Sequence, residues 1–406
     1  MSDAKLILDT LKSVEDELIS LYATESHYKL EDIKILWKDL EVFLDNFDEL
    51  LNNTKNLWII EEKMYNKWER VEILRVPWGR ILYFIPSNSV IPLLPIVSYT
   101  FTYMGNELIL VPSRKTVKTA MRIYEIINPI LNYKLEIFTR GGKAAIEEYV
   151  KSKKVNLVYF QGSSKNRLDI YTACLNSNVE IIFEGEGNTL VIIDETIDSV
   201  EQVAKTIFES KLFCNGQLCT TPNMVFIQDS IFDLFIDTYK KMIPRKYCVR
   251  LINSNAENEL KKMLINLRKK TNNWHLSCEI ENSKGIPIGF FVLHTRQLVK
   301  EFLNREIFSP ILLVASYRNC SDLLKSIQEF EYNYGLQVSI FSKSNELWKK
   351  KLTEVLKIFR ITWNLKPIYQ NSLLPWGGYK RSGYSFPENF FNKALRKVLI
   401  EKGGEK

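Results

Sequence analysis

Short apolar segments alternate with amphipathic segments along most of this chain, and that alternation restricts the possible folds more than any other feature. Between residues 80 and 184, apolar runs of strand length are separated by segments whose apolar residues have helical spacing. These runs are 81–85, 107–111, 135–138, 155–160 and 179–183. A second series follows between residues 190 and 358. Repeated strand–helix units predict an α/β protein with two parallel sheets, each covered by helices.

The length of the chain, 406 residues, is more than one ordinary core accommodates. Segment 4–55 has the spacing of amphipathic helices, and segment 57–76 is typical of two strands around a turn. Such a hairpin often serves in strand pairing between subunits. We therefore divide the chain into N-terminal helices packed on the first domain (1–56), an oligomerisation hairpin (57–76), a first α/β domain (77–184), a second α/β domain (185–365) and a C-terminal return segment (366–406).

Charge and hydropathy exclude several classes of function. The net charge of +7, from 55 basic and 48 acidic residues, is mild and gives no reason to expect a nucleic-acid partner. Segment 90–103 is the longest candidate for a membrane span, but Pro92 and Pro95 interrupt it. The acidic, amphipathic N-terminus is unlike a signal peptide. We expect a soluble cytoplasmic protein without a membrane span.

The cysteines and histidines limit the possible chemistry. The three histidines lack metal-ligand spacing, and the six cysteines form no CxxC pair. We expect reduced thiols, with neither a disulfide framework nor a metal site. Any catalysis must then use Cys, Glu and Asn. Basic clusters at 261–262, 268–270 and 349–351 are either solvated helix faces or docking sites for an acidic partner.

The stretch 213–219 is the best candidate for a catalytic segment. It ends in Cys219, after a predicted helix at 199–210 and before a predicted strand at 224–227. Gly216 and Gln217 would break the helix and let the backbone approach a bound carbonyl. A thiolate at that position could attack the carbonyl and divide one hard step into two easier ones. Alternatively, Cys219 is a small buried apolar residue.

Taken in order, seven segments resemble the motifs of the aldehyde dehydrogenase superfamily, across roughly residues 57–400. The segments are 76–79 with 85–88, 105–113, 160–164, 184–188, 213–219, 306–310 and 375–383. Segment 184–188 is an altered Glu-Leu-Gly-Gly-Lys motif, and 213–219 is one residue shorter than the family's nucleophile motif. The resemblance implies a Rossmann-like NAD(P)-binding domain, a second α/β catalytic domain and a β-hairpin appendage for oligomerisation, most simply into a homodimer.

The resemblance also implies catalytic roles. Cys219 would attack an aldehyde or thioester carbonyl, and hydride would pass between the resulting tetrahedral carbon and a nicotinamide. The side-chain amide of Asn88 and the backbone N–H of Cys219 would stabilise the oxyanion, unless Asn88 is only a turn residue after Pro86. Glu184 best matches the carboxylate that activates water, and Glu186 is the alternative. A solvated loop carboxylate without a role is also possible at either position.

The same comparison implies a cofactor site. Gly162 and Ser163 would lie beside the pyrophosphate, Glu306 would hold the nicotinamide ribose, and Phe308 would pack beside it. Arg114 stands where the family has an acidic residue, and a guanidinium there could pair with a 2′-phosphate. We therefore expect NADPH rather than NAD, unless Arg114 merely begins an exposed helix. The full expected set is Pro86, Ser87, Val111, Pro112, Ser113, Arg114, Gly162, Ser163, Glu306 and Phe308.

The altered segment 184–188 and the N-terminal helices resemble the acyl-thioester reductase branch of the superfamily. We expect NADPH-dependent reduction of an acyl thioester, carried by CoA or an acyl carrier protein, to an aldehyde. The alternatives are NAD(P)-dependent oxidation of an aldehyde to a carboxylic acid, and a decayed enzyme that serves as a binding scaffold.

Overall fold

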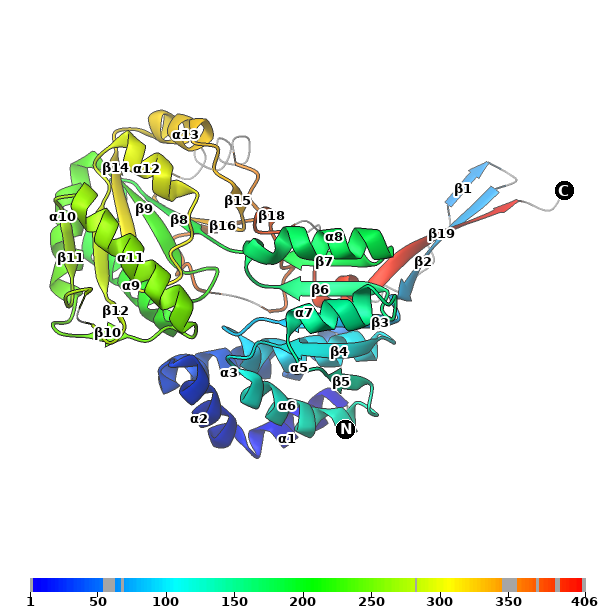
Figure 1. Cartoon of the computed structure of the whole chain (residues 1–406). Helices are drawn as coiled ribbons and strands as arrows, with labels where there is room; N and C mark the ends of the chain where they lie inside the picture. The colour runs from blue at the N-terminus through cyan, green and yellow to red at the C-terminus, as the bar shows by residue number, and fades with distance from the viewer. Residues whose placement is uncertain are drawn as a thin grey trace.

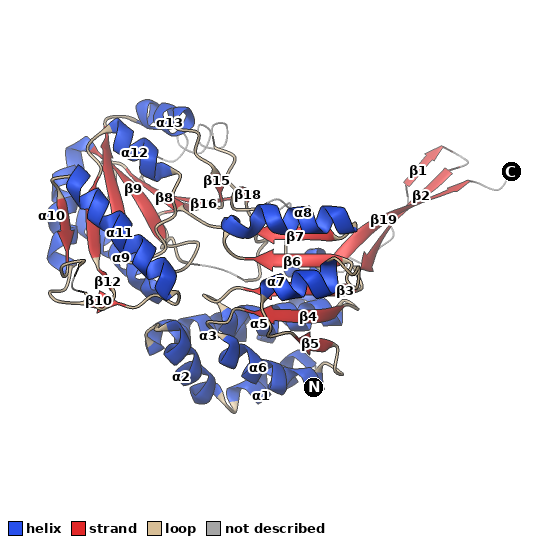
Figure 2. Ribbon diagram, in the orientation of Figure 1, coloured by secondary structure: helices blue, strands red, loops and turns tan. Residues whose placement is uncertain are grey.

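The computed structural model describes residues 3–53, 63–66, 69–281, 283–344, 356–369, 372–383 and 388–403. Two α/β bodies lie side by side, with helices of the N-terminal segment beneath one of them (Figure 1). A narrow β arm projects from the same body and carries the C-terminal end of the chain. Figure 2 shows helices on both faces of each main sheet, which is the α/β architecture that the alternating sequence pattern predicts.

The first sheet is entirely parallel, with strand order β5-β4-β3-β6-β7. Its strands are β3 (Arg80–Ile85), β4 (Glu107–Pro112), β5 (Leu135–Ile137), β6 (Leu157–Gln161) and β7 (Glu180–Glu184). The helices that connect them are α5 (Val90–Tyr103), α6 (Val117–Ile130), α7 (Gly142–Ala145) and α8 (Arg167–Ser177), with a π-helical turn (Ile146–Val150) after α7. Strand order reverses beside β3, so the carboxyl ends of β3, β4 and β6 meet where parallel sheets bind ligands.

Four N-terminal helices cover one side of this body. They are α1 (Asp3–Lys12), α2 (Glu15–Ser26), α3 (Leu30–Asp45) and α4 (Phe47–Asn53). Helix α3 packs along α5, while α1 and α2 pack on α6, and their apolar residues join the core on that face of the sheet. The Glu25 carboxylate accepts the backbone N–H groups of Lys118 and Thr119 at 3.1 and 2.9 Å, which fixes α2 against the positive end of α6.

The second sheet has strand order β11-β13-β14-β9-β8-β16-β17 and is parallel except for β11. Its strands are β8 (Thr189–Ile193), β9 (Pro222–Gln228), β11 (Trp274–Leu276), β13 (Gly289–Val292), β14 (Ile311–Tyr317), β16 (Gln337–Phe341) and β17 (Arg360–Trp363). Successive residues of β8 enter opposite cores, because side chains alternate along a strand. Helices α9 (Val200–Leu212) and α10 (Asp229–Met242) cover one face, and α11 (Ser254–Lys270), α12 (Arg296–Leu303) and α13 (Cys320–Glu329) cover the other.

The C-terminal segment returns to the first body. Strand β19 (Leu395–Gly403) pairs antiparallel with β2 (Glu69–Pro77), which also pairs with β1 (Lys63–Asn66). These three strands form the arm in Figure 1. Residues 57–62 and 67–68 of the predicted hairpin lie outside the described residues, as do residues 346–355 near the end of the second predicted series. Residues 356–358 are not helical.

One expectation about cysteine is wrong. Cys248 and Cys278 form a disulfide, so two of the six thiols are not free. They belong to separate connections 30 residues apart, and Cys248 lies in the short strand β10 (Cys248–Val249), which pairs with β12 (Ile286–Pro287). Sequence spacing alone gives no sign that these connections meet. Within the described residues, no helix is long and apolar enough to cross a membrane, and no group of three or more potential ligand residues could hold a metal.

Candidate active site

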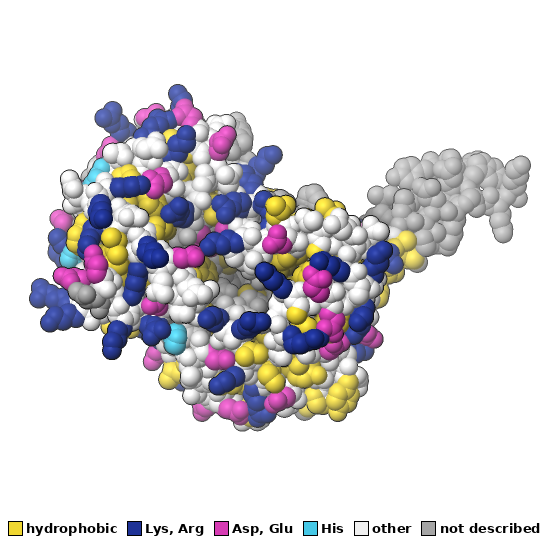
Figure 3. Space-filling model, in the orientation of Figure 1, with side chains coloured by type: hydrophobic (Ala, Val, Ile, Leu, Met, Phe, Trp, Pro, Cys, Tyr) yellow, Lys and Arg dark blue, Asp and Glu magenta, His cyan; other side chains and the backbone are white. Residues whose placement is uncertain are grey.

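A cleft of about 1390 Å³ lies where the two bodies meet. Figure 3 shows the surface hollowed there, with Lys and Arg side chains around the opening. Every residue that the sequence assigned to catalysis or cofactor binding lines this cleft. These residues are Cys219, Asn88, Glu184, Pro86, Ser87, Val111, Pro112, Ser113, Arg114, Gly162, Ser163, Glu306 and Phe308. Their individual roles stay predictions.

The loop that carries the thiol is held by the N-terminal helices. After α9, the backbone turns sharply, and Cys214 and Asn215 adopt positive φ angles of 49° and 54°. The Asp32 carboxylate on α3 accepts the Cys214 N–H at 2.9 Å, and the Asn215 side chain donates to the His27 carbonyl at 2.8 Å. These contacts satisfy polar groups that an irregular buried loop would otherwise leave unpaired. The N-terminal helices therefore help to shape the candidate site.

Both bodies contribute to the position of Cys219. From the first α/β body, the Asn88 side-chain amide donates to the Gln217 carbonyl at 3.0 Å. From β8, the Thr189 hydroxyl donates to the Cys219 carbonyl at 3.1 Å. Gly187 packs so closely that a Cβ there would lie 1.8 Å from that carbonyl oxygen, which excludes any larger residue. Asn88 and the nucleophile loop are thus direct neighbours.

The Cys219 thiol is poorly ionised in this environment. Burial raises its pKa to about 12, and the negative charges of Glu306 and Glu184 add to the effect. At neutral pH the sulfur keeps its proton, so it needs a base or a nearby positive charge to become a nucleophile.

Glu306 is the carboxylate with the largest electrostatic effect on that thiol. Burial raises the pKa of Glu306 to about 7, although hydrogen bonds from the backbone N–H groups of Gly187 (2.9 Å) and Asn188 (3.3 Å) oppose the shift. A group with that pKa can take or give a proton near neutrality.

Lys211 lies close to Glu306 and was missed in the sequence. It is fully buried on α9, where its ammonium donates to the Ile307 carbonyl at 3.2 Å. Burial lowers the pKa of Lys211 to about 7, and the charge of Glu306 opposes the shift. The available signal was its position directly after the predicted helix at 199–210 and two residues before the catalytic segment.

Glu184 is buried and fully engaged rather than solvated. Its carboxylate accepts hydrogen bonds from the Tyr159 hydroxyl at 3.1 Å and the Gln161 amide at 2.6 Å, and it forms an ion pair with Lys393. The Lys393 and Glu184 side chains are only 3% and 7% exposed. To accept a proton from water, Glu184 would have to weaken at least one of these contacts. Lys393 was not predicted, because it is 209 residues away in sequence.

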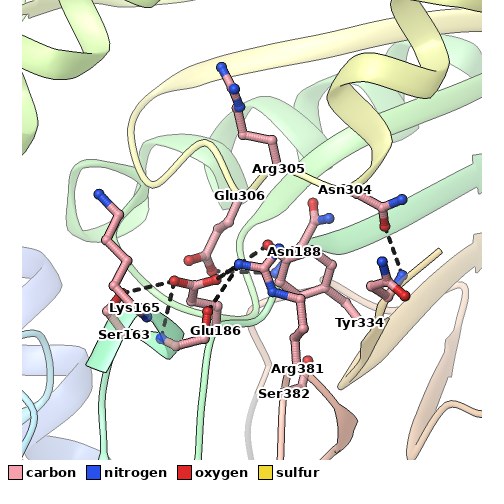
Figure 4. A network of polar contacts seen from close by, with 12 residues as sticks. Ser163, Lys165, Glu186, Asn188, Asn304, Arg305, Glu306, Tyr334, Arg381 and Ser382 are labelled. Atoms are coloured by element: carbon pink, nitrogen blue, oxygen red, sulfur yellow. Dashed lines mark hydrogen bonds and ion pairs between the residues drawn. The ribbon is translucent and has the colours of Figure 1, made fainter. Parts of the chain in front are cut away.

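The Glu186 carboxylate binds the turn of Gly162 and Ser163, which was expected to lie beside the pyrophosphate. Figure 4 shows its carboxylate between the turn, Tyr334 and Arg381. It accepts the Ser163 hydroxyl at 2.9 Å, the Ser164 backbone N–H at 3.2 Å, and longer bonds of 3.3 Å from Tyr334 and Arg381. The turn therefore already presents its donors to an oxyanion. Arg381 and Tyr334 are cleft residues that sequence reasoning missed.

Beyond the carboxyl ends of β4 and β5, three exposed cations line the cleft, namely Arg114, Arg140 and Lys143. The Arg114 guanidinium donates to the Arg140 carbonyl at 3.1 Å and packs over Gly141. The cleft exceeds the roughly 300–1,000 Å³ of common ligand pockets. The cleft thus brings together exposed cations, the donors of Ser163 and Ser164, and a thiol.

The fold and cleft define a two-domain α/β protein with a cysteine at the junction of its domains. The aldehyde dehydrogenase family model matches residues 5–401. This chain therefore belongs to the aldehyde dehydrogenase family, which confirms the resemblance inferred from its motifs.

Curated relatives include the 4,4′-diaponeurosporen-aldehyde dehydrogenase of Staphylococcus aureus, which is 23% identical over 90% of this chain and 77% of its own length. The aldehyde dehydrogenase [NAD(P)+] 2 of Saccharomyces cerevisiae is 25% identical over 76% of this chain. This chain spans only 64% of the yeast protein, so the activity of the longer relatives does not transfer to it directly.

Solved structures confirm the fold. The apo betaine aldehyde dehydrogenase of Staphylococcus aureus superposes with a TM-score of 0.86, over 98% of this chain and 82% of that one, at 18% identity. An NADP-dependent enzyme of E. coli gives a TM-score of 0.87 over 99% of this chain and 85% of its own, at 16% identity. Identities this low establish a shared fold alone.

Proposed function

We propose that this protein is an NAD(P)-dependent oxidoreductase that acts on an aldehyde or acyl carbon through a covalent bond to Cys219. The observation that carries the proposal is the contact between Asn88 and the loop of Cys219, inside a cleft large enough for a dinucleotide. Sulfur would attack the carbonyl carbon, and the C=O electron pair would move to oxygen, beside the Asn88 amide. A bound nicotinamide supplies or accepts the hydride at that carbon.

The thiol proton has a candidate acceptor. Glu306 lines the same cleft as Cys219, and its pKa of about 7 allows it to exist partly as a carboxylate at neutral pH. The Glu306 carboxylate accepts the backbone N–H of Gly187, and Gly187 packs on Cys219. This contact holds Glu306 near the loop of Cys219. Glu306 would thus act on the thiol in addition to any contact with ribose.

NADPH is the proposed cofactor. Arg114, Arg140 and Lys143 form a cationic group at the end of β4 and β5, where an adenosine 2′-phosphate would find a bidentate partner. The yeast relative is named for NAD(P)+, and the E. coli structure is described as NADP-dependent. Replacing Arg114 with Glu should weaken NADPH binding much more than NADH binding. Equal effects on both cofactors would remove the argument for NADPH.

The proposed direction is reduction of an acyl thioester to an aldehyde. Deacylation by water needs a free carboxylate base, and Glu184 is already engaged with Lys393, Tyr159 and Gln161. A carrier thioester would exchange its acyl group onto Cys219 and release the carrier thiol. Hydride delivery to the carbonyl carbon would then give a thiohemiacetal, and cleavage of its C–S bond would yield the aldehyde and the free Cys219 thiol.

The carrier would be CoA or an acyl carrier protein. The basic residues of α11 give limited support for an acidic protein partner, since Arg268 pairs with Glu281 and Lys270 with Glu301. The cluster at 349–351 lies outside the described residues. We also propose that the arm of β1, β2 and β19 pairs two copies of the chain, because β1 and β19 are the edge strands of its described sheet and the arm projects from the main body (Figure 1).

A second candidate is oxidation of an aldehyde to a carboxylic acid. The curated relatives carry the names of aldehyde dehydrogenases, and Glu184 lies close enough to Cys219 for its charge to affect the thiol. A rearrangement that freed Glu184 from Lys393 would supply the missing base.

Two assays separate these candidates. The purified protein is given acyl-CoA with NADPH, and separately an aldehyde with NADP. Aldehyde formation in the first assay supports thioester reduction, and activity only in the second overturns it. Cys219→Ala should abolish both activities. Failure of the wild-type protein in both assays, together with no binding of NADPH or NADH, would refute the proposed class.

A further inference from the structure

Part of the cleft is lined by the N-terminal helix α3, by α5 and by the return segment, and we call this part the helix branch. Helix α5 begins just after Asn88, and three of its residues, Pro92, Leu93 and Ile96, line the cleft. Val90 to Ile96 rises about 9 Å along a helix axis. This branch therefore extends from the candidate oxyanion site along α5.

Helix α3 and the return segment form the other walls of this branch. Leu36 and Asp39 of α3 line the cleft, as do Leu374 and Trp376 of the return segment. The two walls meet where the Ser372 hydroxyl lies 3.5 Å from the Asp39 main-chain carbonyl. The lining is largely apolar, and Asp39 contributes a carboxylate to it.

That carboxylate has no counter-charge among the residues that the structure describes. None of them donates a hydrogen bond to its side chain or forms an ion pair with it, and burial is the only cause acting on its pKa, which rises to about 6. At neutral pH it remains mostly ionised. A desolvated charge without a partner is unfavourable, so a cation brought by a ligand would gain more here than at an exposed surface.

We propose that Asp39 binds a cationic group on the substrate, so that the preferred aldehyde or acyl chain carries an ammonium at the end distant from its carbonyl. The aromatic and aliphatic residues around Asp39 would pack on the carbon chain, and the indole of Trp376 suits an ammonium group as well. This inference rests on the proposed function, because it places the carbonyl at Cys219.

A matched pair of aldehydes tests the proposal. 4-(Trimethylammonio)butanal and 5,5-dimethylhexanal have the same shape and differ only in charge. With NADP or NAD, the wild-type protein should have a kcat/KM about tenfold or more higher for the cation. Asp39→Asn should remove most of that preference and leave the neutral aldehyde within about twofold, whereas Asp39→Glu should retain part of it. Glu31→Gln, at an exposed position of the same helix, should change neither value.

A binding measurement separates this inference from the proposed function. Butyltrimethylammonium should protect Cys219 from iodoacetamide at pH 9 in the wild-type protein but not in Asp39→Asn, and n-butanol should protect neither. If both aldehydes react equally well, or if Asp39→Asn keeps the preference for the cation, the inference fails while the oxidoreductase proposal stands. If neither the aldehydes nor acyl-CoA turn over and neither NADPH nor NADH binds, but the Asp39-dependent protection is present, the inference stands and the oxidoreductase proposal fails.

Discussion

The side-chain nitrogen of Asn88 lies 3.0 Å from the carbonyl oxygen of Gln217, two residues before the thiol of Cys219. An asparagine amide has two N–H groups, and this contact uses one of them. The other remains available for an oxygen in the cleft that Asn88 lines. The contact therefore orients the amide, and it ties the end of β3 to the nucleophile loop of the other body.

Replacing Asn88 with Ala should lower kcat by about 10²–10³-fold, the usual effect of removing one oxyanion donor. Substrate KM should change much less, because the oxyanion forms only after attack. Steady-state kinetics in the productive assay measures both constants. Asn88→Asp is the matched control of similar size, and it should be at least as impaired because it replaces the donor with a carboxylate. A loss smaller than about threefold in the Ala variant would contradict the role of Asn88.

The raised pKa of Cys219 predicts a steep pH dependence of alkylation. Below a pKa of about 12, the thiolate fraction increases about tenfold for each pH unit, so iodoacetamide should react with no plateau between pH 7 and 10. Glu306→Gln removes a negative neighbour, lowers the Cys219 pKa and should accelerate labelling. Mass spectrometry of the labelled peptide distinguishes Cys219 from Cys320. A plateau below pH 9 would show that the free protein already stabilises the thiolate.

The ion pair between Glu184 and Lys393 should be strongly coupled. Because both side chains are almost completely buried, Lys393→Met leaves an unpaired buried carboxylate and should cost about 3–5 kcal/mol of unfolding free energy. The double variant Glu184→Gln/Lys393→Met removes both charges and should recover much of that loss. Urea unfolding of the wild type, both single variants and the double variant measures the coupling. Additive losses would show that the pair contributes little.

The sequence predicts the local elements well because hydrophobic periodicity is a local signal. Each strand from β3 to β7 is within two residues of its predicted start, and the thiol loop follows its predicted helix. Helix α12 was not predicted, and α11 was indicated only by its basic clusters and without bounds, since it is strongly polar along most of its length. The order of the motifs was sufficient to predict which residues line the cleft, because the carboxyl ends of parallel strands lie along one edge of a sheet.

Contacts between segments distant in sequence were not predictable. The pairing of Lys393 with Glu184, of Arg381 with Glu186 and of Cys248 with Cys278 depends on where connections meet in space. Hydrophobic periodicity carries no information about contacts between segments that are distant in sequence. The return segment is the clearest example: it was predicted only by its bounds, 366–406, yet its Lys393 and Arg381 engage both loop carboxylates.

Glu186 competes with any diphosphate for the Ser163 and Ser164 donors. Glu186→Gln should therefore tighten NADPH binding several-fold, because it removes a like charge and frees Arg381 for the phosphate. Quenching of intrinsic fluorescence by NADPH measures the dissociation constant. Glu259→Gln, on an exposed carboxylate that also lines the cleft, controls for a general change in charge. Weaker binding in Glu186→Gln would instead mean that Glu186 is needed to hold Arg381 in place.

The raised pKa of Asp39 gives two pH effects of opposite direction. Its charge disappears as pH falls through about 6, and the quaternary aldehyde keeps its charge at every pH. The preference for the cation should therefore be constant above pH 7 and decline below pH 6.

The free energy of unfolding should depend on pH in the opposite direction. An acid whose folded pKa lies above its unfolded value binds more protons when the protein is folded. Its stabilising contribution is therefore lost as pH rises through 6. Asp39→Asn should accordingly raise the melting temperature most above pH 6, less at pH 5, and little below about pH 4, where the carboxyl is protonated in both states. A variant that gains stability at pH 8 while losing cation preference would show that Asp39 is retained for binding rather than for folding.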